Sequence, residues 1–240
     1  MRTDGRLPEE TRPLKLTRDF TRYAQGSVLV EAGETRVICT AMAESRVPRH
    51  CLSANMGWVS AEYTMLPGAN PDRRSLHGRP NGRTLEISRL IGRSLRAAVD
   101  LTQMPGITIW VDCSVVQADG GTRTASITGG FVALADAIAR LRKDKKIKGD
   151  PLVQGLAAVS VGIVEGRLLV DLCSSEDKAA AVDMNVVMTH DGGFVELQGT
   201  AEGRAFTRQE HDKLIGMAAE AIEQIRGVQM AAISERLKSD

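Results

Sequence analysis

Aromatic residues are scarce in this chain of 240 residues, and neither sign of charge is in excess. Phenylalanine, tryptophan and tyrosine together make up only 3% of the sequence. The 31 lysines and arginines are balanced by 30 acidic residues, which leaves a net charge of +1 and gives no indication of a polyanionic partner. Recognition of such a partner would depend on local clusters of basic residues.

Cysteine is also sparse and is not arranged for metal binding. Cys39, Cys51, Cys113 and Cys173 are far apart, without a Cys-x-x-Cys pair and without a histidine at zinc-ligand spacing. We expect reduced thiols in a cytoplasmic protein. The first residues lack the apolar region of a signal peptide, and no apolar run approaches the length of a membrane span, so we expect no membrane contact.

Apolar residues make up 42% of the chain, which is enough for a packed core in one large domain or two small ones. Each half contains strands first and a helix afterwards, with a break at 149–151, so we predict an α+β fold with domains at 1–150 and 151–240. Residues 1–13 are expected to form an extended arm. The expected strands are 14–20, 27–31, 35–42, 57–66, 107–116, 156–164, 167–172, 183–189 and 194–199, and the expected helices are 84–101, one ending near 142, and 207–237.

The glycine-rich stretch 117–130 follows an alternating apolar run and precedes a helical pattern, so it is predicted to be a strand-to-helix turn. A helix N-terminus offers unpaired N–H groups to an anion, and Gly120 and Gly121 let the backbone approach it closely. The side chains suited to phosphate oxygens are Thr122, Arg123, Thr124 and Ser126. The stretch lacks the P-loop ending and the dinucleotide glycine spacing. A phosphate site and a capped turn with incidental hydroxyls both remain open.

The segment 72–83 contains four arginines and one aspartate, interspersed with glycine and proline. Its arginines are Arg73, Arg74, Arg79 and Arg83. This composition predicts a cationic loop. It is compatible with a solvated surface loop and with a clamp for a polyanion such as RNA.

Two carboxylates, Asp177 and Asp183, are predicted to flank a short linker, with Asp183 at the first position of a strand. A carboxylate pair near a phosphate site has two plausible uses. It can hold Mg²⁺ against phosphate oxygens, or it can supply a proton to a leaving alkoxide. The alternative is structural, with Asp177 capping the linker and Asp183 ending a turn.

Several segments together resemble the RNase PH family of phosphorolytic 3′-exoribonucleases. The resemblance covers essentially the whole chain in the right order. The matching segments are 117–129 (Gln-Ala-Asp-Gly-Gly-Thr-Arg-Thr-Ala-Ser-Ile-Thr-Gly), 82–87, 89–96, 183–188 (Asp-Met-Asn-Val-Val-Met) and 198–203 (Gln-Gly-Thr-Ala-Glu-Gly), with Arg2, 4–6, 35–40 and 58–63 in support. A run of this length is far more specific than a single glycine-rich turn.

The resemblance implies two similar halves, each a two-layer βαβα unit, in a homohexamer built as a trimer of dimers. The implied reaction acts on the 3′ ends of tRNA precursors and other RNAs, with Mg²⁺ as cofactor and inorganic phosphate as co-substrate. Phosphate attacks the last internucleotide phosphorus, and a nucleoside 5′-diphosphate leaves reversibly. By resemblance, phosphate is held by Arg83, Gly121, Thr122, Arg123, Thr124 and Ser126, RNA is contacted by Arg73, Arg74 and Arg79, and the proton donor or metal-binding pair is Asp177 and Asp183.

The chain departs from the family pattern at a few positions. Ser114 stands where an aspartate is usual, and Ser174-Ser175 replaces an expected Tyr-Glu. Three functions stay open at this point. They are phosphorolysis of RNA, a non-catalytic RNA-binding or ring-scaffold subunit, and metal-dependent hydrolysis that uses water.

Overall fold

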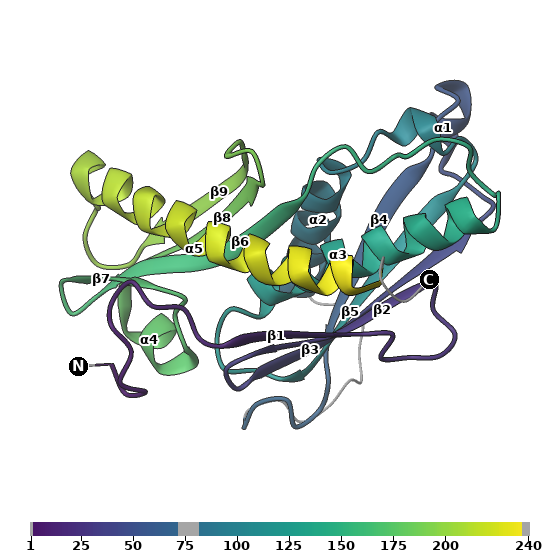
Figure 1. Cartoon of the computed structure of the whole chain (residues 1–240). Helices are drawn as coiled ribbons and strands as arrows, with labels where there is room; N and C mark the ends of the chain where they lie inside the picture. The colour runs from purple at the N-terminus through teal and green to yellow at the C-terminus, as the bar shows by residue number, and fades with distance from the viewer. Residues whose placement is uncertain (1, 72–81, 237–240) are drawn as a thin grey trace.

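A computed structural model of the chain describes residues 2–71 and 82–236, which form two β-sheets and the helices packed on them (Figure 1). The predicted α+β class is confirmed. The strands are β1 (Leu14–Arg18), β2 (Gly26–Ala32), β3 (Thr35–Glu44), β4 (Trp58–Met65), β5 (Thr108–Gln117), β6 (Leu156–Val164), β7 (Arg167–Val170), β8 (Ala180–Thr189) and β9 (Phe194–Ala201). The helices are α1 (Arg49–Ser53), α2 (Gly82–Arg96), the 3-10 turn η1 (Leu101–Gln103), α3 (Thr122–Lys143), α4 (Ser174–Ala179) and α5 (Arg208–Arg236).

The first sheet has the strand order β1-β2-β3-β5-β4. Only β4 and β5 pair in parallel, and such a pair needs a crossover connection, which α2 supplies between them. Alternate residues of β5 are buried against the helices, as the apolar alternation predicts. The C-terminal end of β5 therefore leads directly into the turn that precedes α3.

The second sheet has the antiparallel order β7-β6-β8-β9, and both faces of its two central strands are covered. Leu156, Ala158 and Val187 belong to the core that surrounds α3, whereas the alternate residues of β6 and β8 pack with the buried face of α5. Helix α3 thus packs against both sheets, and α5 lies on the far face of the second sheet (Figure 1).

Helix α3 is long and apolar enough to span a bilayer by length and composition, contrary to the expectation that no run approaches that length. However, 89% of its apolar window is buried inside the protein. Its apolar residues are therefore accounted for by packing between the two sheets. The four cysteines are all buried and carry free thiols.

The N-terminal segment folds back beside β7 and α4, so the prediction of an extended arm is wrong (Figure 1). Pro8 accepts a hydrogen bond from the Val170 N–H at 2.9 Å. Two buried ion pairs fasten the segment, Arg2 with Glu176 at 2.8 Å and Arg12 with Asp171 at 2.6 Å. A lone buried charge is costly, and these partners lie more than 150 positions away in the sequence.

Three other expectations are corrected by the structure. The helix expected at 84–101 ends at Arg96. The linker expected between Asp177 and Asp183 consists of the end of the short helix α4 and the start of β8. The first turn of α4 is closed by Glu176, which accepts the Cys173 N–H at 3.0 Å. Because β8 begins at Ala180, Asp183 is inside the strand rather than at its first position.

The Arg12–Asp171 pair predicts an acid-sensitive contribution to stability. Burial raises the pKa of the Asp171 carboxyl, but hydrogen bonds and charge from Arg12 outweigh it and hold the pKa below the usual value of 3.8. A depressed folded-state pKa gives stability that is complete above the unfolded pKa and is lost as pH falls through the folded one. We therefore expect Asp171→Asn to lower the free energy of unfolding by about 3–5 kcal/mol near neutral pH, since it leaves Arg12 uncompensated.

Urea unfolding of the parent protein and of Asp171→Asn at several acid pH values measures this difference in the free energy of unfolding. The gap between Asp171→Asn and the parent should narrow as the pH drops below the usual carboxyl pKa. The exposed residue Asp212 offers a control, and Asp212→Asn should match the parent. A gap that is constant at every pH would contradict the assignment.

Candidate active site

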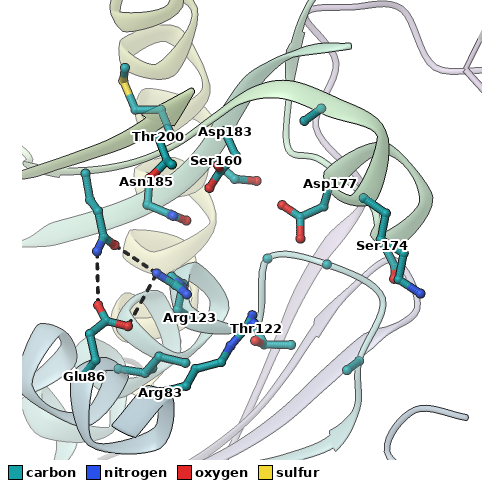
Figure 2. Close-up of a pocket in the computed structure, with 18 of the residues that line it drawn as sticks. Arg83, Glu86, Thr122, Arg123, Ser160, Ser174, Asp177, Asp183, Asn185 and Thr200 are labelled. Atoms are coloured by element: carbon teal, nitrogen blue, oxygen red, sulfur yellow. Dashed lines mark hydrogen bonds and ion pairs between the residues drawn. The ribbon is translucent and has the colours of Figure 1, made fainter. Parts of the chain in front are cut away.

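A cavity of about 730 Å³ opens where the N-terminus of α3 meets α2, α4 and the second sheet (Figure 2). It brings together residues from distant parts of the chain. Its lining includes Arg83 and Glu86 from α2, Gly121, Thr122 and Arg123 from the glycine-rich turn, Asp177 from α4, and Ser160, Asp183, Asn185, Gln198 and Thr200 from the sheet. The glycine-rich turn and both predicted carboxylates therefore share one site.

The glycine-rich turn has the backbone form that an anion site requires. Gly120 and Gly121 have φ angles of 75° and 62°, and a side chain on Gly120 would collide with the Leu172 carbonyl, 2.4 Å from the position of a Cβ atom. Gly121 is the N-cap of α3, without a side-chain cap. The first N–H groups of the helix therefore have no partner within it, which argues against the interpretation as a capped turn.

The three hydroxyls of this turn have different surroundings. Thr124 donates to the Gly121 carbonyl at 2.9 Å and Ser126 donates to the Thr122 carbonyl at 2.7 Å. Both side chains are buried, and neither lines the cavity. Thr122 does line it, with its Oγ1 2.8 Å from the Tyr63 hydroxyl, and burial raises the pKa of that tyrosine. Thr122 is thus the hydroxyl that the structure presents to a ligand.

Arg123 is oriented by a pair of polar neighbours. Its Nη1 donates to Gln198 Oε1 at 2.9 Å and lies 3.8 Å from a carboxylate oxygen of Glu86. Gln198 in turn donates to Glu86 at 3.2 Å, which closes a small network (Figure 2). Arg83 is exposed beside it on α2 and forms no hydrogen bond or ion pair with the other described residues. The guanidinium groups of Arg83 and Arg123 therefore border the cavity near the N-terminus of α3.

The second sheet supplies the opposite wall through one face of β8. Val187 on this face packs against α3, and Asn185 and Asp183 follow at alternate positions, beyond the apolar contact. Asp183 is paired in register with Thr200 on β9, and Asn185 with Gln198. The change from apolar to polar residues along this face places Asp183 in the cavity.

Asp177 and Asp183 point into the same space from α4 and β8 (Figure 2). Partial burial by the cavity walls raises the pKa of the Asp177 carboxyl, and the negative charge of Asp183 raises it further. Arg83 and Arg123 act in the opposite direction but are outweighed. Neither carboxylate accepts a hydrogen bond or ion pair from a residue that the structure describes. Asp177 is therefore suited to carry a proton.

The same pair fits a divalent cation. Mg²⁺ is commonly held by one or two carboxylates together with phosphate oxygens of the substrate. The repulsion between Asp177 and Asp183 would be relieved by a cation placed between them. Within residues 2–71 and 82–236 no cluster of three or more acidic, histidine or cysteine side chains forms a complete metal site. Substrate oxygens would have to complete the coordination.

Several residues of the site were not singled out from the sequence. Gln198 and Glu86 occur in the motifs quoted above, but their contact with Arg123 depends on strand pairing that the sequence does not reveal. Tyr63 follows from the alternation of β4, which turns it inward. The RNA-contacting arginines implied by resemblance, Arg73, Arg74 and Arg79, lie outside the described residues.

Family models identify the class of protein that this fold and cavity define. Residues 10–139 match the model for domain 1 of the 3′ exoribonuclease family, and residues 156–221 match the model for domain 2. Together the two matches cover well over half of the chain. The chain therefore belongs to the 3′ exoribonuclease family, the phosphorolytic family that also includes RNase PH.

Solved structures agree with the fold. The structure of rice (Oryza sativa) Rrp46 matches with a TM-score of 0.79 at 20% identity, covering 96% of this chain and 99% of that one. An Archaeoglobus fulgidus exosome with RNA bound to the active site matches with a TM-score of 0.83 at 22% identity, covering 94% and 91%. An archaeal exosome core gives 0.79 at 20% identity, covering 95% and 91%. At these identities the likeness is one of fold.

Proposed function

We propose that this chain is an active, phosphate-dependent 3′-to-5′ exoribonuclease that trims the 3′ ends of tRNA precursors and other RNAs in the cytoplasm. The observation that carries the proposal is the single cavity in which Thr122 and Arg123 face Asp177 and Asp183. Inactive members of such a family would be expected to lose the arginine or a carboxylate. Both are retained here.

The cavity offers a separate role to each group. The free N–H groups at the start of α3, with Thr122, Arg123 and Arg83, would hold inorganic phosphate, since bringing two anions together needs prepositioned positive charge. An oxygen of this phosphate attacks the last internucleotide phosphorus, and the bond to the ribose 3′-oxygen breaks. The 3′-oxygen takes the electron pair and a proton, and a nucleoside 5′-diphosphate leaves.

The carboxylates would act at the leaving oxygen. A protonated Asp177 can donate the proton, and Asp183 keeps that proton in place by raising the pKa of its neighbour. With both carboxylates ionised, Mg²⁺ held by the pair would instead supply neutralisation of the charge that develops there. Ser160, Asn185 and Thr200 lie beside Asp183 and would border the terminal nucleotide.

The assembly is also proposed. Membership of this family and the fold shared with exosome cores support a ring of several subunits, and we propose a homohexamer built as a trimer of dimers. Mass measurement of the native protein tests the subunit number. A monomer in solution would contradict it.

Incubation of the protein with Mg²⁺ and a tRNA carrying a 3′ tail tests the activity, with and without inorganic phosphate. Release of nucleoside diphosphates only when phosphate is present is the expected result. Phosphate-independent release of nucleoside monophosphates would favour metal-dependent hydrolysis. RNA binding without any turnover would favour a ring-scaffold subunit and would contradict the proposal.

The pH dependence of kcat tests Asp177 as the proton donor. With Asp177 as the proton donor, kcat falls as the pH rises through its raised pKa, because the active form is protonated. Arg83 lowers the pKa of Asp177. In Arg83→Gln, the fall of kcat at alkaline pH should therefore shift to higher pH when phosphate is saturating. Arg89→Gln, at an exposed position of the same helix, should leave the pH at which kcat falls unchanged. The same alkaline pKa in the kcat profiles of the parent, Arg83→Gln and Arg89→Gln would exclude Asp177 as the proton donor.

A further inference from the structure

Arg12 lies on the opposite side of the glycine-rich turn from the cavity. Its side chain is only 5% exposed and does not line the cavity. Its Nη1 donates to the carbonyl oxygen of Asp119 at 2.5 Å, and its Nη2 lies 3.5 Å from that of Gly120. Nη2 and Nε also donate to the Asp171 carboxylate, at 2.6 and 2.9 Å. One guanidinium thus joins the turn to the start of the segment that leads into α4.

Thr35 also holds the Gly120 carbonyl, and it holds the N–H of Asp119 as well. Its hydroxyl donates to the Gly120 carbonyl at 2.7 Å and accepts the Asp119 N–H at 2.9 Å, and the side chain is fully buried. In a trans peptide the C=O and the next N–H point in opposite directions. Holding the carbonyl oxygens of Asp119 and Gly120 on Arg12 and Thr35 therefore turns the N–H groups of Gly120 and Gly121 away from them.

Those N–H groups are left for a ligand. In the described part of the chain neither the Gly120 nor the Gly121 N–H has a hydrogen-bond partner, and both glycines line the cavity. Both glycines are half-buried at the wall of the cavity, so these unpaired donors are available to a ligand. Arg12 cannot reach the ligand itself, but it fixes the donors that can.

A second set of contacts links Arg12 to the helix that carries Asp177. Asp171 precedes α4 by three residues, and the Asp119 carboxylate accepts the Ser174 N–H at 3.1 Å at the start of that helix. Arg2 completes the link by holding both Glu176 and the Asp171 carbonyl, at 2.8 and 2.9 Å. The glycine-rich turn and α4, the helix that carries Asp177, are therefore connected to each other through the N-terminal segment.

We propose that Arg12 is a positioning residue for the attacking phosphate, acting with Thr35 to hold the backbone of the glycine-rich turn in its anion-binding form. This inference rests on the proposed phosphorolytic function. Preorganised donors matter because a shift of about 1 Å can cost on the order of 100-fold in rate. Lysine cannot replace the guanidinium here, since it lacks the planar fork that bridges a carboxylate and two carbonyls.

The test compares Arg12→Lys with the parent by measuring KM for phosphate, KM for RNA and kcat. Arg12→Lys should raise KM for phosphate about 10- to 100-fold, the scale of loosened preorganisation, with KM for RNA unchanged. Arg18 supplies a matched control, because it forms a buried pair with Asp136 that does not line the cavity. Arg18→Lys should lower thermal stability without moving KM for phosphate.

A milder variant covers the case in which Arg12→Lys does not fold. Thr35→Val removes the hydroxyl that holds the Gly120 carbonyl and the Asp119 N–H, and should also raise KM for phosphate. Thr108→Val is its control, since the buried Thr108 hydroxyl donates to the Arg46 carbonyl away from the cavity. Unchanged phosphate KM in Thr35→Val, or equal rises in the variants and their controls, would overturn the positioning role. A parent protein without phosphate dependence would instead overturn the proposed function, and this inference with it.

Discussion

Asp183→Asn is expected to lower kcat by about 10²- to 10⁴-fold, the range for loss of general acid catalysis, because Asp183 is the neighbour that favours the protonated form of Asp177. Asp183 faces the cavity from inside β8, between Gly162 on β6 and Thr200 on β9, so the nearly isosteric asparagine should not disturb the sheet. The substitution removes the carboxylate needed for Mg²⁺ and also the charge that raises the pKa of Asp177. Both changes disfavour departure of the ribose oxygen.

RNA binding should survive this change, because the arginines and backbone donors of the cavity remain. Titration of the variant with a labelled single-stranded RNA measures that binding, and initial rates at saturating substrate give kcat. Asp191→Asn is the matched control, since Asp191 is an exposed carboxylate in the β8–β9 turn of the same hairpin. Turnover of Asp183→Asn near the parent rate would remove Asp183 from the mechanism.

Arg123→Ala is expected to raise KM for phosphate about 10- to 100-fold, because a charge-assisted hydrogen bond is worth roughly 1.5–3 kcal/mol. The guanidinium lies at the first turn of α3, where its charge adds to the free N–H groups. Gln198 and Glu86 hold it in place, so little side-chain entropy is lost on binding. Assembly of subunits should be unaffected.

Arg93 provides the comparison for this variant. Like Arg123 it bridges from a helix to a residue of β9, in this case Glu196 at 2.8 Å, but it does not line the cavity. Arg93→Ala should leave KM for phosphate at the parent value. Initial rates against phosphate concentration give both constants. An Arg123→Ala protein with unchanged phosphate dependence would refute the assignment of the phosphate site.

The long, strongly periodic elements were predictable from the sequence. The alternation in β5 and the apolar pattern of α3 are enough to locate the turn between them. Helix α4 was missed because its six residues are mostly polar and too short to show a period. The N-terminal segment was misjudged because its partners, Glu176 and Asp171, come from the other half of the chain.

The site was predictable in its chemistry and less so in its geometry. Thr122, Arg123, Asp177 and Asp183 do meet in one cavity, whereas the hydroxyls of Thr124 and Ser126 turn back onto helix carbonyls. Serine and threonine hydroxyls inside a helix commonly bond the preceding turn, which the local sequence alone does not exclude. The phosphate-binding role of each residue stays a prediction.

The fate of labelled phosphate tests the central claim most directly. Radiolabelled inorganic phosphate is supplied with Mg²⁺ and an RNA that ends in a single-stranded 3′ tail, and the released nucleotides are separated. We expect the label in nucleoside 5′-diphosphates, with one phosphate incorporated for every nucleotide removed. Release of unlabelled nucleoside 5′-monophosphates would show that water is the nucleophile and would contradict a phosphate site at the start of α3.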